Sequence, residues 1–153
     1  MPAASDRPAD RALPSLPHTW RPFGVRIAVI GLGLMLVVVC VAAWLGFDES
    51  VRDRVSFLQR ATLFAFGVGA GACGWALCRA RVTAETGRLV VVNGFRRREL
   101  EWEQVLAVHL SSGAPWASLD LADGTTIAAM AFQGSDGQRA GQGVRQLRAL
   151  LDR

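Results

Sequence analysis

The chain has 153 residues, of which 51% are hydrophobic, and its mean hydropathy of +0.26 is unusually high for a soluble domain of this size. Only 20% of the residues are charged, against roughly 25% in an average globular protein, and the net charge is +4, which together favour a membrane-associated chain. The length allows one ordinary domain, or a membrane segment with a small module, and excludes a large multidomain enzyme.

The N-terminal segment, residues 1–24, holds five of the six prolines among small and charged residues. No apolar periodicity can be drawn through it, so it lacks the side chains that would build a packed core. We predict that residues 1–24 form a disordered cytoplasmic tail.

Two uncharged apolar runs follow this tail. The first, Ile27 to Phe47, has 21 residues, and as a helix about 31 Å long it matches a hydrocarbon core of about 30 Å. It starts too late and lasts too long for a secretory signal peptide, which is the main alternative. The second run, Ala61 to Cys78, is shorter. We predict transmembrane helices at 25–47 and 61–78, joined by a short external loop at 48–60.

A stripe of small residues marks the second helix. Gly67, Gly71 and Gly74 recur at helical spacing, and the first two form a GxxxG pair, which lets another backbone approach closely in membrane helices. We expect this stripe to pack inside the hairpin, against Gly31 and Gly33, rather than to form a dimer. The alternative is that these glycines are unrelated to packing, since glycine is common in membrane helices.

Arginine asymmetry predicts the orientation of the hairpin. The flank before the first helix and the flank after the second are rich in arginine, whereas the three arginines of the connecting loop are offset by three acidic residues. By the positive-inside rule, we predict a multi-pass protein of the inner membrane with both termini in the cytoplasm.

The segment after the hairpin changes to the period of β-strands. Six short strands are predicted, with a tight turn at Asn93–Gly94 and a second at Asp123–Gly124, and they form an antiparallel meander. The chain closes with an amphipathic helix. Ser135 and Gln138 have the spacing of a capping box there, and the predicted buried face is Ala140, Val144, Leu147 and Leu151.

This arrangement resembles the pleckstrin-homology (PH) plan, and specifically the small PH-like domain of membrane proteins from high-GC bacteria. The resemblance covers about residues 81–153 and rests on five residues at matching places in the order of strands: Asn93, Gly94, Trp102, Asp123 and Gly124. It implies an α+β fold, in which a two-helix transmembrane hairpin precedes a small antiparallel β half-barrel with a C-terminal helix. The module (79–153) is small, so we expect fewer than seven strands.

Eukaryotic PH domains bind phosphoinositides through a basic loop between their first two strands. The turn that we assign to this place, Glu85 to Gly87, is acidic and small. The resemblance therefore does not imply a lipid site at this turn.

No motif indicates catalysis, a cofactor or a bound metal. The three cysteines and two histidines do not have ligand spacing, and His109 is the one histidine within a predicted strand. Neither membrane helix carries an internal charge that could serve an ion path. The module has a charge balance of only +2, which argues against nucleic acid as a partner. We expect a non-enzymatic protein.

Arg96, Arg97 and Arg98 form a cluster with two interpretations. Either these charges pair with Glu99 and Glu101 on a solvated hairpin, or they contact anionic lipid head groups of the adjacent bilayer. Alternation along the strand places Arg96 and Arg98 on one face, which makes these two the candidate membrane-surface patch.

The sequence thus predicts a membrane protein that presents a PH-like binding module for protein or lipid at the cytoplasmic face. Its expected partners are the lipid bilayer, a membrane or cytoplasmic protein that the sequence does not identify, and anionic lipid head groups. The alternative is a small accessory subunit of a membrane complex, in which the helices carry the partner contacts.

Overall fold

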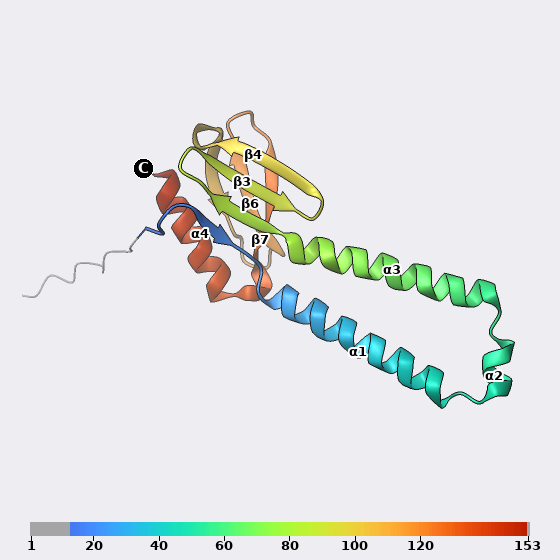
Figure 1. Cartoon of the computed structure of the whole chain (residues 1–153). Coiled ribbons are helices and arrows are strands. Elements are labelled where there is room, and N and C mark those ends of the chain that lie inside the picture. Colours follow the sequence, from blue (N-terminus) through green and yellow to red (C-terminus); the bar gives the residue numbers. More distant parts are fainter. Residues whose placement is uncertain (1–12, 153) are drawn as a thin grey trace, which may run out of the picture.

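The structure, a computed structural model, describes residues 13–152. Two long helices, α1 (Gly24–Gly46) and α3 (Phe57–Arg79), extend from a β module and are joined at their far ends by the short helix α2 (Glu49–Arg54) (Figure 1). The module carries one further helix, α4 (Gln138–Leu151), and the short 3₁₀ turns η1 (Trp102–Gln104) and η2 (Gly134–Asp136). Of the predicted tail at residues 1–24, the first twelve residues lie outside the described residues.

The module contains two antiparallel sheets. The first has the order β1-β2-β3-β4 and the second the order β5-β6-β7. Their strands are β1 (His18–Trp20), β2 (Arg81–Ala84), β3 (Arg88–Asn93), β4 (Arg96–Glu101), β5 (Val105–His109), β6 (Trp116–Leu121) and β7 (Thr126–Gln133). The six predicted strands are thus all present, and the α+β PH-like fold is confirmed.

The first strand of the module lies before the hairpin. β1 pairs with β2, with Thr19 opposite Thr83 and Trp20 opposite Val82. The prediction of a disordered tail is therefore wrong for His18–Trp20, and the module has seven strands rather than fewer. Trp20 is 9% exposed and packs in the core of the module.

The position of β1 changes which loop joins the first two strands. This connection is not the turn at Glu85–Gly87, which joins β2 to β3, but the whole hairpin of α1, α2 and α3. Because β1 and β2 are antiparallel neighbours, the start of α1 and the end of α3 lie on the same side of the module (Figure 1). The hairpin is thus an insertion between two paired strands.

The core lies between the two sheets and is closed by α4. Alternation along β3 points Leu89 and Val91 toward the other sheet, where they join side chains from β6, β7 and α4. The largest fully buried hydrophobic side chains come from both sheets and from α4: Phe132, Leu89, Leu119, Leu147, Val82, Val91 and Val108. One continuous core therefore holds the N-terminal strand, the later strands and the C-terminal helix together.

The buried face of α4 is largely as predicted. Ala140, Val144 and Leu147 are buried, but Leu150 rather than Leu151 completes the face. The predicted capping box is wrong, because Ser135 lies in η2 and the N-cap of α4 is Gly137, with φ +52° and no side-chain cap. The positive φ, which glycine adopts without a steric cost, gives the chain its turn into α4.

The first membrane-type helix has the predicted length, shifted by one residue, whereas the second is five residues longer than the predicted 61–78. α3 begins at Phe57 because Ser56 and Gln59 form a capping box, in which Ser56 Oγ accepts from the Gln59 N–H and Gln59 Oε1 accepts from the Ser56 N–H. Both α1 and α3 have 23 residues, or about 35 Å of helix. Two helices of the described chain are thus long and apolar enough to cross a membrane.

Candidate functional site

The β3–β4 turn carries the predicted arginine cluster. Asn93 pairs with Arg96, so the turn has two central residues, Gly94 and Phe95. Gly94 has φ +59°, as the first central residue of a type II′ turn requires. The Phe95 side chain at the tip is 68% exposed. The chain thus holds a large apolar side chain and three arginines at one exposed turn.

Alternation along β4 separates the three arginines. Arg97 Nη2 lies 2.6 Å from Glu99 Oε1, and Glu99 Oε2 lies 2.6 Å from Arg88 Nη1. Hydrogen bonding to Glu85, together with the charges of Glu85 and Glu99, raises the pKa of Arg88. Arg97 therefore belongs to an exposed network of paired charges on the outer face of the sheet.

Arg96 and Arg98 lie on the opposite face of β4 from Arg97, since neighbours along a strand alternate. Both are exposed, and neither forms an ion pair with any residue that the structure describes. The structure thus places Arg96 and Arg98 on one face of β4 without a salt bridge in the described chain, and the charge of Arg98 helps to lower the pKa of Asp123.

The turn lies against the last turns of α3. A Cβ atom at Gly94 would lie 3.5 Å from the Ala76 Cβ, and the rings of Phe95 and Trp75 have centroids 5.9 Å apart. The Arg79 guanidinium stacks over the Trp75 ring at 4.4 Å. In Figure 1 the β3–β4 hairpin reaches over the module end of α3. An aromatic and basic surface therefore surrounds the point at which α3 meets the module.

The glycine stripe is only partly used inside the hairpin. A Cβ atom at Gly74 would lie 2.8 Å from Val29 Cγ1, so α1 and α3 are in contact there. At Gly67 and Gly71, a Cβ atom would meet nothing within 4 Å in the described chain. The expected packing against Gly31 and Gly33 is wrong, because a Cβ atom at either of these glycines would also meet nothing within 4 Å in the described chain.

Sequence reasoning missed a junction between the module and α1. Asp136 of η2 accepts the N–H groups of Phe23 and Gly24 through Oδ2 and Oδ1, both at 2.8 Å. Arg139 stacks over the Phe23 ring at 4.3 Å. The partners are more than 110 residues apart, so no local pattern could have indicated them. A carboxylate of the module therefore binds the first N–H groups of α1.

The residues that carry the resemblance to the PH family have structural roles. Asn93 joins the two sheets, because its Nδ2 donates to the Ala128 carbonyl and its Oδ1 accepts the Met130 N–H. Trp102 Nε1 donates to the Glu85 carbonyl at 3.1 Å. At the β6–β7 turn, Asp123 Oδ1 accepts from the Thr125 hydroxyl and N–H. These bonds, the one to the hydroxyl first, hold the pKa of Asp123 below its ordinary value.

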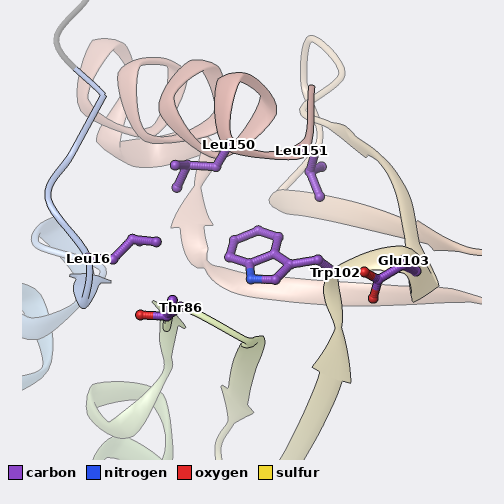
Figure 2. A pocket seen from close by; sticks show the side chains of 6 residues that line it. All are labelled: Leu16, Thr86, Trp102, Glu103, Leu150 and Leu151. Carbon is purple, nitrogen blue, oxygen red and sulfur yellow. The ribbon is translucent and has the colours of Figure 1, made fainter. Parts of the chain in front are cut away.

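A cavity of about 310 Å³ lies at the end of β3 opposite the β3–β4 turn. Figure 2 shows the Trp102 ring between Leu16 and the leucines at the end of α4, with Glu103 to one side. The lining residues are Leu16, Thr86, Trp102, Glu103, Leu150 and Leu151. One carboxylate among mostly apolar side chains does not provide the paired acid and base, or the activated nucleophile, that catalysis needs.

Metal ligation has no candidate among residues 13–152, where no group of three or more His, Cys, Asp or Glu side chains could hold an ion. His109 Nε2 lies 2.9 Å from Asp120 Oδ2 on the exposed side of β5 and β6, as a local surface pair.

The comparisons with known proteins agree with the fold. Residues 79–150 match the bacterial PH domain family. Over 75 residues the chain is 36% identical to an uncharacterised protein of Mycobacterium bovis and to uncharacterised proteins of two Mycobacterium tuberculosis strains. Each match covers 49% of this chain, which itself spans about half the length of these curated relatives.

No solved structure matches the chain significantly. The family match begins at the end of α3 and continues into α4, so it contains six of the seven strands. Residues 79–150 are a bacterial PH domain, and β1, from before the hairpin, adds the first strand to its sheet.

Proposed function

We propose that this chain is a non-enzymatic integral membrane protein that presents its PH domain as a binding module at the cytoplasmic face of the inner membrane. The observation that carries the proposal is the insertion of two long apolar helices between the paired strands β1 and β2. Both ends of the inserted hairpin leave the module on one side, so the module is held at the surface from which the hairpin enters the bilayer.

The surroundings of the helix side chains support a membrane location. Neither α1 nor α3 has a buried residue, although α1 exposes leucine, valine and isoleucine along its length. In water, each such side chain would cost about 1.5–3 kcal/mol relative to an apolar environment. A core helix of a soluble protein would be mostly buried, and a cleaved signal peptide would remove β1 from the folded sheet. Insertion of both helices into a bilayer accounts for the exposed apolar side chains and keeps β1 in the sheet.

Aromatic side chains support the placement of the membrane boundaries. At the far end of the hairpin Arg60 lies 5.2 Å from the Trp44 ring, and at the module end Arg79 lies 4.4 Å from the Trp75 ring. Tryptophan is enriched at membrane–water interfaces, and arginine extends its charge toward the head groups. With the arginine-rich flanks next to the module, the positive-inside rule favours a cytoplasmic module and cytoplasmic termini.

Arg96 and Arg98 are the candidate contacts to lipid head groups. Both are exposed and lack an ion-pair partner in the described chain. Arg96 closes the turn that adjoins α3, and Arg98 lies two residues further along β4. Each arginine near an anionic leaflet gains roughly 1 kcal/mol.

The second candidate function is an accessory subunit whose helices bind another membrane protein. The uncovered positions of Gly67 and Gly71 favour it, because a GxxxG face allows close approach of another helix and the hairpin itself does not use it. Photo-cross-linkers in the native membrane separate the two functions, by attaching partners either to α3 next to Gly67 or to the PH domain.

The topology is tested with a reporter that is active only in the periplasm. Inserted at Ser50, in the exposed α2 that joins the long helices, the reporter should be active, whereas the same reporter after Arg153 should be silent. The reverse pattern would refute the orientation. Activity at both positions would mean that only one helix crosses the membrane.

A further inference from the structure

We propose that the β3–β4 turn is a membrane wedge, in which Phe95 enters the boundary between head groups and acyl chains beside α3. The partner is the bilayer that α3 itself crosses, and the inference rests on the proposed membrane location. It extends that function in one respect: the PH domain has a fixed depth and orientation on the lipid surface, set by its own turn, and does not hang freely from the helices.

The depth of Phe95 follows from its contacts with α3. Trp75 precedes the last residue of α3, Arg79, by four residues, or about 6 Å along the helix axis. A helix of about 35 Å exceeds a hydrocarbon core of about 30 Å by only about 2 Å at each end. Trp75 therefore lies about 4 Å inside the boundary of that core, and the Phe95 ring centroid is 5.9 Å from that of Trp75.

The backbone of the turn shares this depth. The Cβ position of Gly94 lies 3.5 Å from the Ala76 Cβ and 3.9 Å from the Ala76 carbonyl oxygen. Glycine is favoured here by the positive φ of the turn, and the distances to Ala76 are those of ordinary van der Waals contact. The turn therefore lies directly on α3, within the last two turns of the helix, and cannot lie above the head groups while Trp75 is below them.

The side chains around the turn suit a lipid interface. Phe95 is 68% exposed and Trp75 is 55% exposed, so their contact leaves most of both rings uncovered. Arg79 stacks on Trp75, and Arg96 follows Phe95 directly. A ring that enters the bilayer next to guanidinium groups at head-group height is the pattern of interfacial segments that bind anionic membranes.

Continuity with α3 selects the bilayer over a protein partner. A soluble protein that covered Phe95 would have to occupy the volume beside Trp75 and Ala76, which lipid fills once α3 crosses the membrane. The wedge therefore needs no partner beyond the lipid that already surrounds the helix.

The experiment measures the depth of spin labels in the full-length chain, reconstituted in vesicles of phosphatidylglycerol and phosphatidylethanolamine. Cys40, Cys73 and Cys78 are first replaced by alanine, and single cysteines are then introduced by Phe95→Cys, Thr86→Cys or Leu63→Cys. Thr86 is the matched control, because it is exposed and lies at the opposite end of β3. Leu63 lies inside α3 and reports on the span itself.

The label at Phe95 should collide more with oxygen, which concentrates in lipid, than with a water-soluble nickel complex, and the label at Thr86 should show the reverse. If the labels at Phe95 and Thr86 are equally accessible to nickel while Leu63 is protected, the wedge is wrong and the membrane span stands. If Leu63 is also accessible to nickel, the membrane location itself fails.

A second experiment tests the insertion of Phe95 without a label at Phe95 itself, in case that label disturbs the turn. A label at Arg96 should be shielded from nickel with Phe95 present and become at least twofold more accessible with Phe95→Ser. An unchanged nickel accessibility at Arg96 would overturn the role of Phe95 as the inserting group.

Discussion

Asp136 provides the sharpest test of how the PH domain is coupled to the first membrane helix. Its carboxylate accepts two hydrogen bonds at 2.8 Å, from the N–H groups of Phe23 and Gly24. Replacing an aspartate that caps a helix by alanine costs about 0.5–2 kcal/mol. For a domain of 60–100 residues, 1 kcal/mol corresponds to about 4–8 °C in Tm. We therefore expect Asp136→Ala to lower the Tm of the module by about 2–16 °C.

The assay is thermal unfolding of the full chain in mild detergent, followed by near-ultraviolet circular dichroism, together with hydrogen exchange at the two amides. Asp136→Asn is the matched control. It keeps one acceptor oxygen but loses the charge and the second acceptor, so its Tm should lie between those of the native protein and Asp136→Ala. The amides of Phe23 and Gly24 should exchange faster in both variants, and fastest in Asp136→Ala.

Gly24→Ala tests the same contact between α1 and Asp136 by changing the residue on the helix. A Cβ atom at Gly24 would lie 2.7 Å from Asp136 Oδ1, so the added methyl group must push the carboxylate away. Since both changes break one contact, their effects on Tm should not add in the double variant. Full additivity, or an Asp136→Ala protein with native Tm and native amide exchange, would refute the coupling of η2 to α1.

Two further predictions concern the module itself. Leu147→Asp should abolish the cooperative melt of the module, because Leu147 is fully buried on the inner face of α4 and the new charge would have no partner there. A native-like melt would show that the buried face of α4 is misassigned. Asp123→Asn should lower the stability of the module at neutral pH but not in acid. The pKa of Asp123 is lower in the folded state than in the unfolded state, so its carboxylate stabilises the fold above the unfolded-state pKa, and this stabilisation is lost as the pH falls through the folded-state pKa. A difference in Tm between native protein and Asp123→Asn that stays constant from about pH 6 to about pH 2 would contradict this role.

Local patterns were enough to predict the later strands. Asn93–Gly94 and Asp123–Gly124 mark turns within a few residues of the strands they join, and both glycines have positive φ in the structure. Alternation then predicts which side chains of β4 share a face, including the separation of Arg97 from Arg96 and Arg98. These features depend only on residues that are close together in the chain, so they can be predicted from a single sequence.

β1 could not be predicted in this way. Its three residues are too few to establish a period, and the strand forms because Trp20 packs against Phe132 and donates to Gln146 Oε1, far along the chain. The contact of Phe95 with Trp75 is of the same kind, since it needs the relative placement of a helix and a hairpin. The arginine cluster and the turn at Asn93–Gly94 could be predicted from the sequence, but the contact of this turn with α3 could not.

The two capping-box patterns show how context decides a motif. Ser56 and Gln59 form a capping box that we did not predict from the sequence, whereas Ser135 and Gln138, with the same spacing, do not form one. The residues after each serine make the difference, because a helix begins directly after Ser56, whereas Gly137 turns the chain before α4. Asp136 then serves the start of α1 rather than its own helix.

The contribution of β1 leads to a prediction about the isolated PH domain. Residues 79–153 contain the entire family match but lack β1, so the edge of β2 and the sites that hold Trp20 would be open to water. Joining residues 13–23 to Arg79 through a short glycine-serine linker would replace the hairpin and restore the strand, because Trp20 lies directly opposite Val82. We expect the joined chain to melt cooperatively, and residues 79–153 alone to be less stable by at least the about 3–5 kcal/mol that loss of a buried tryptophan costs.

Trp20→Ala in the joined chain is the control for this comparison, since it keeps the backbone of β1 but removes the ring that packs on Phe132 and the donor to Gln146. Its stability, measured by urea unfolding, should fall most of the way to that of residues 79–153. If residues 79–153 alone unfold at the same urea concentration as the joined chain, β1 adds nothing to the domain. The hairpin would then be attached beside a complete PH domain rather than inserted into one, and α1 would be free to move relative to the sheet.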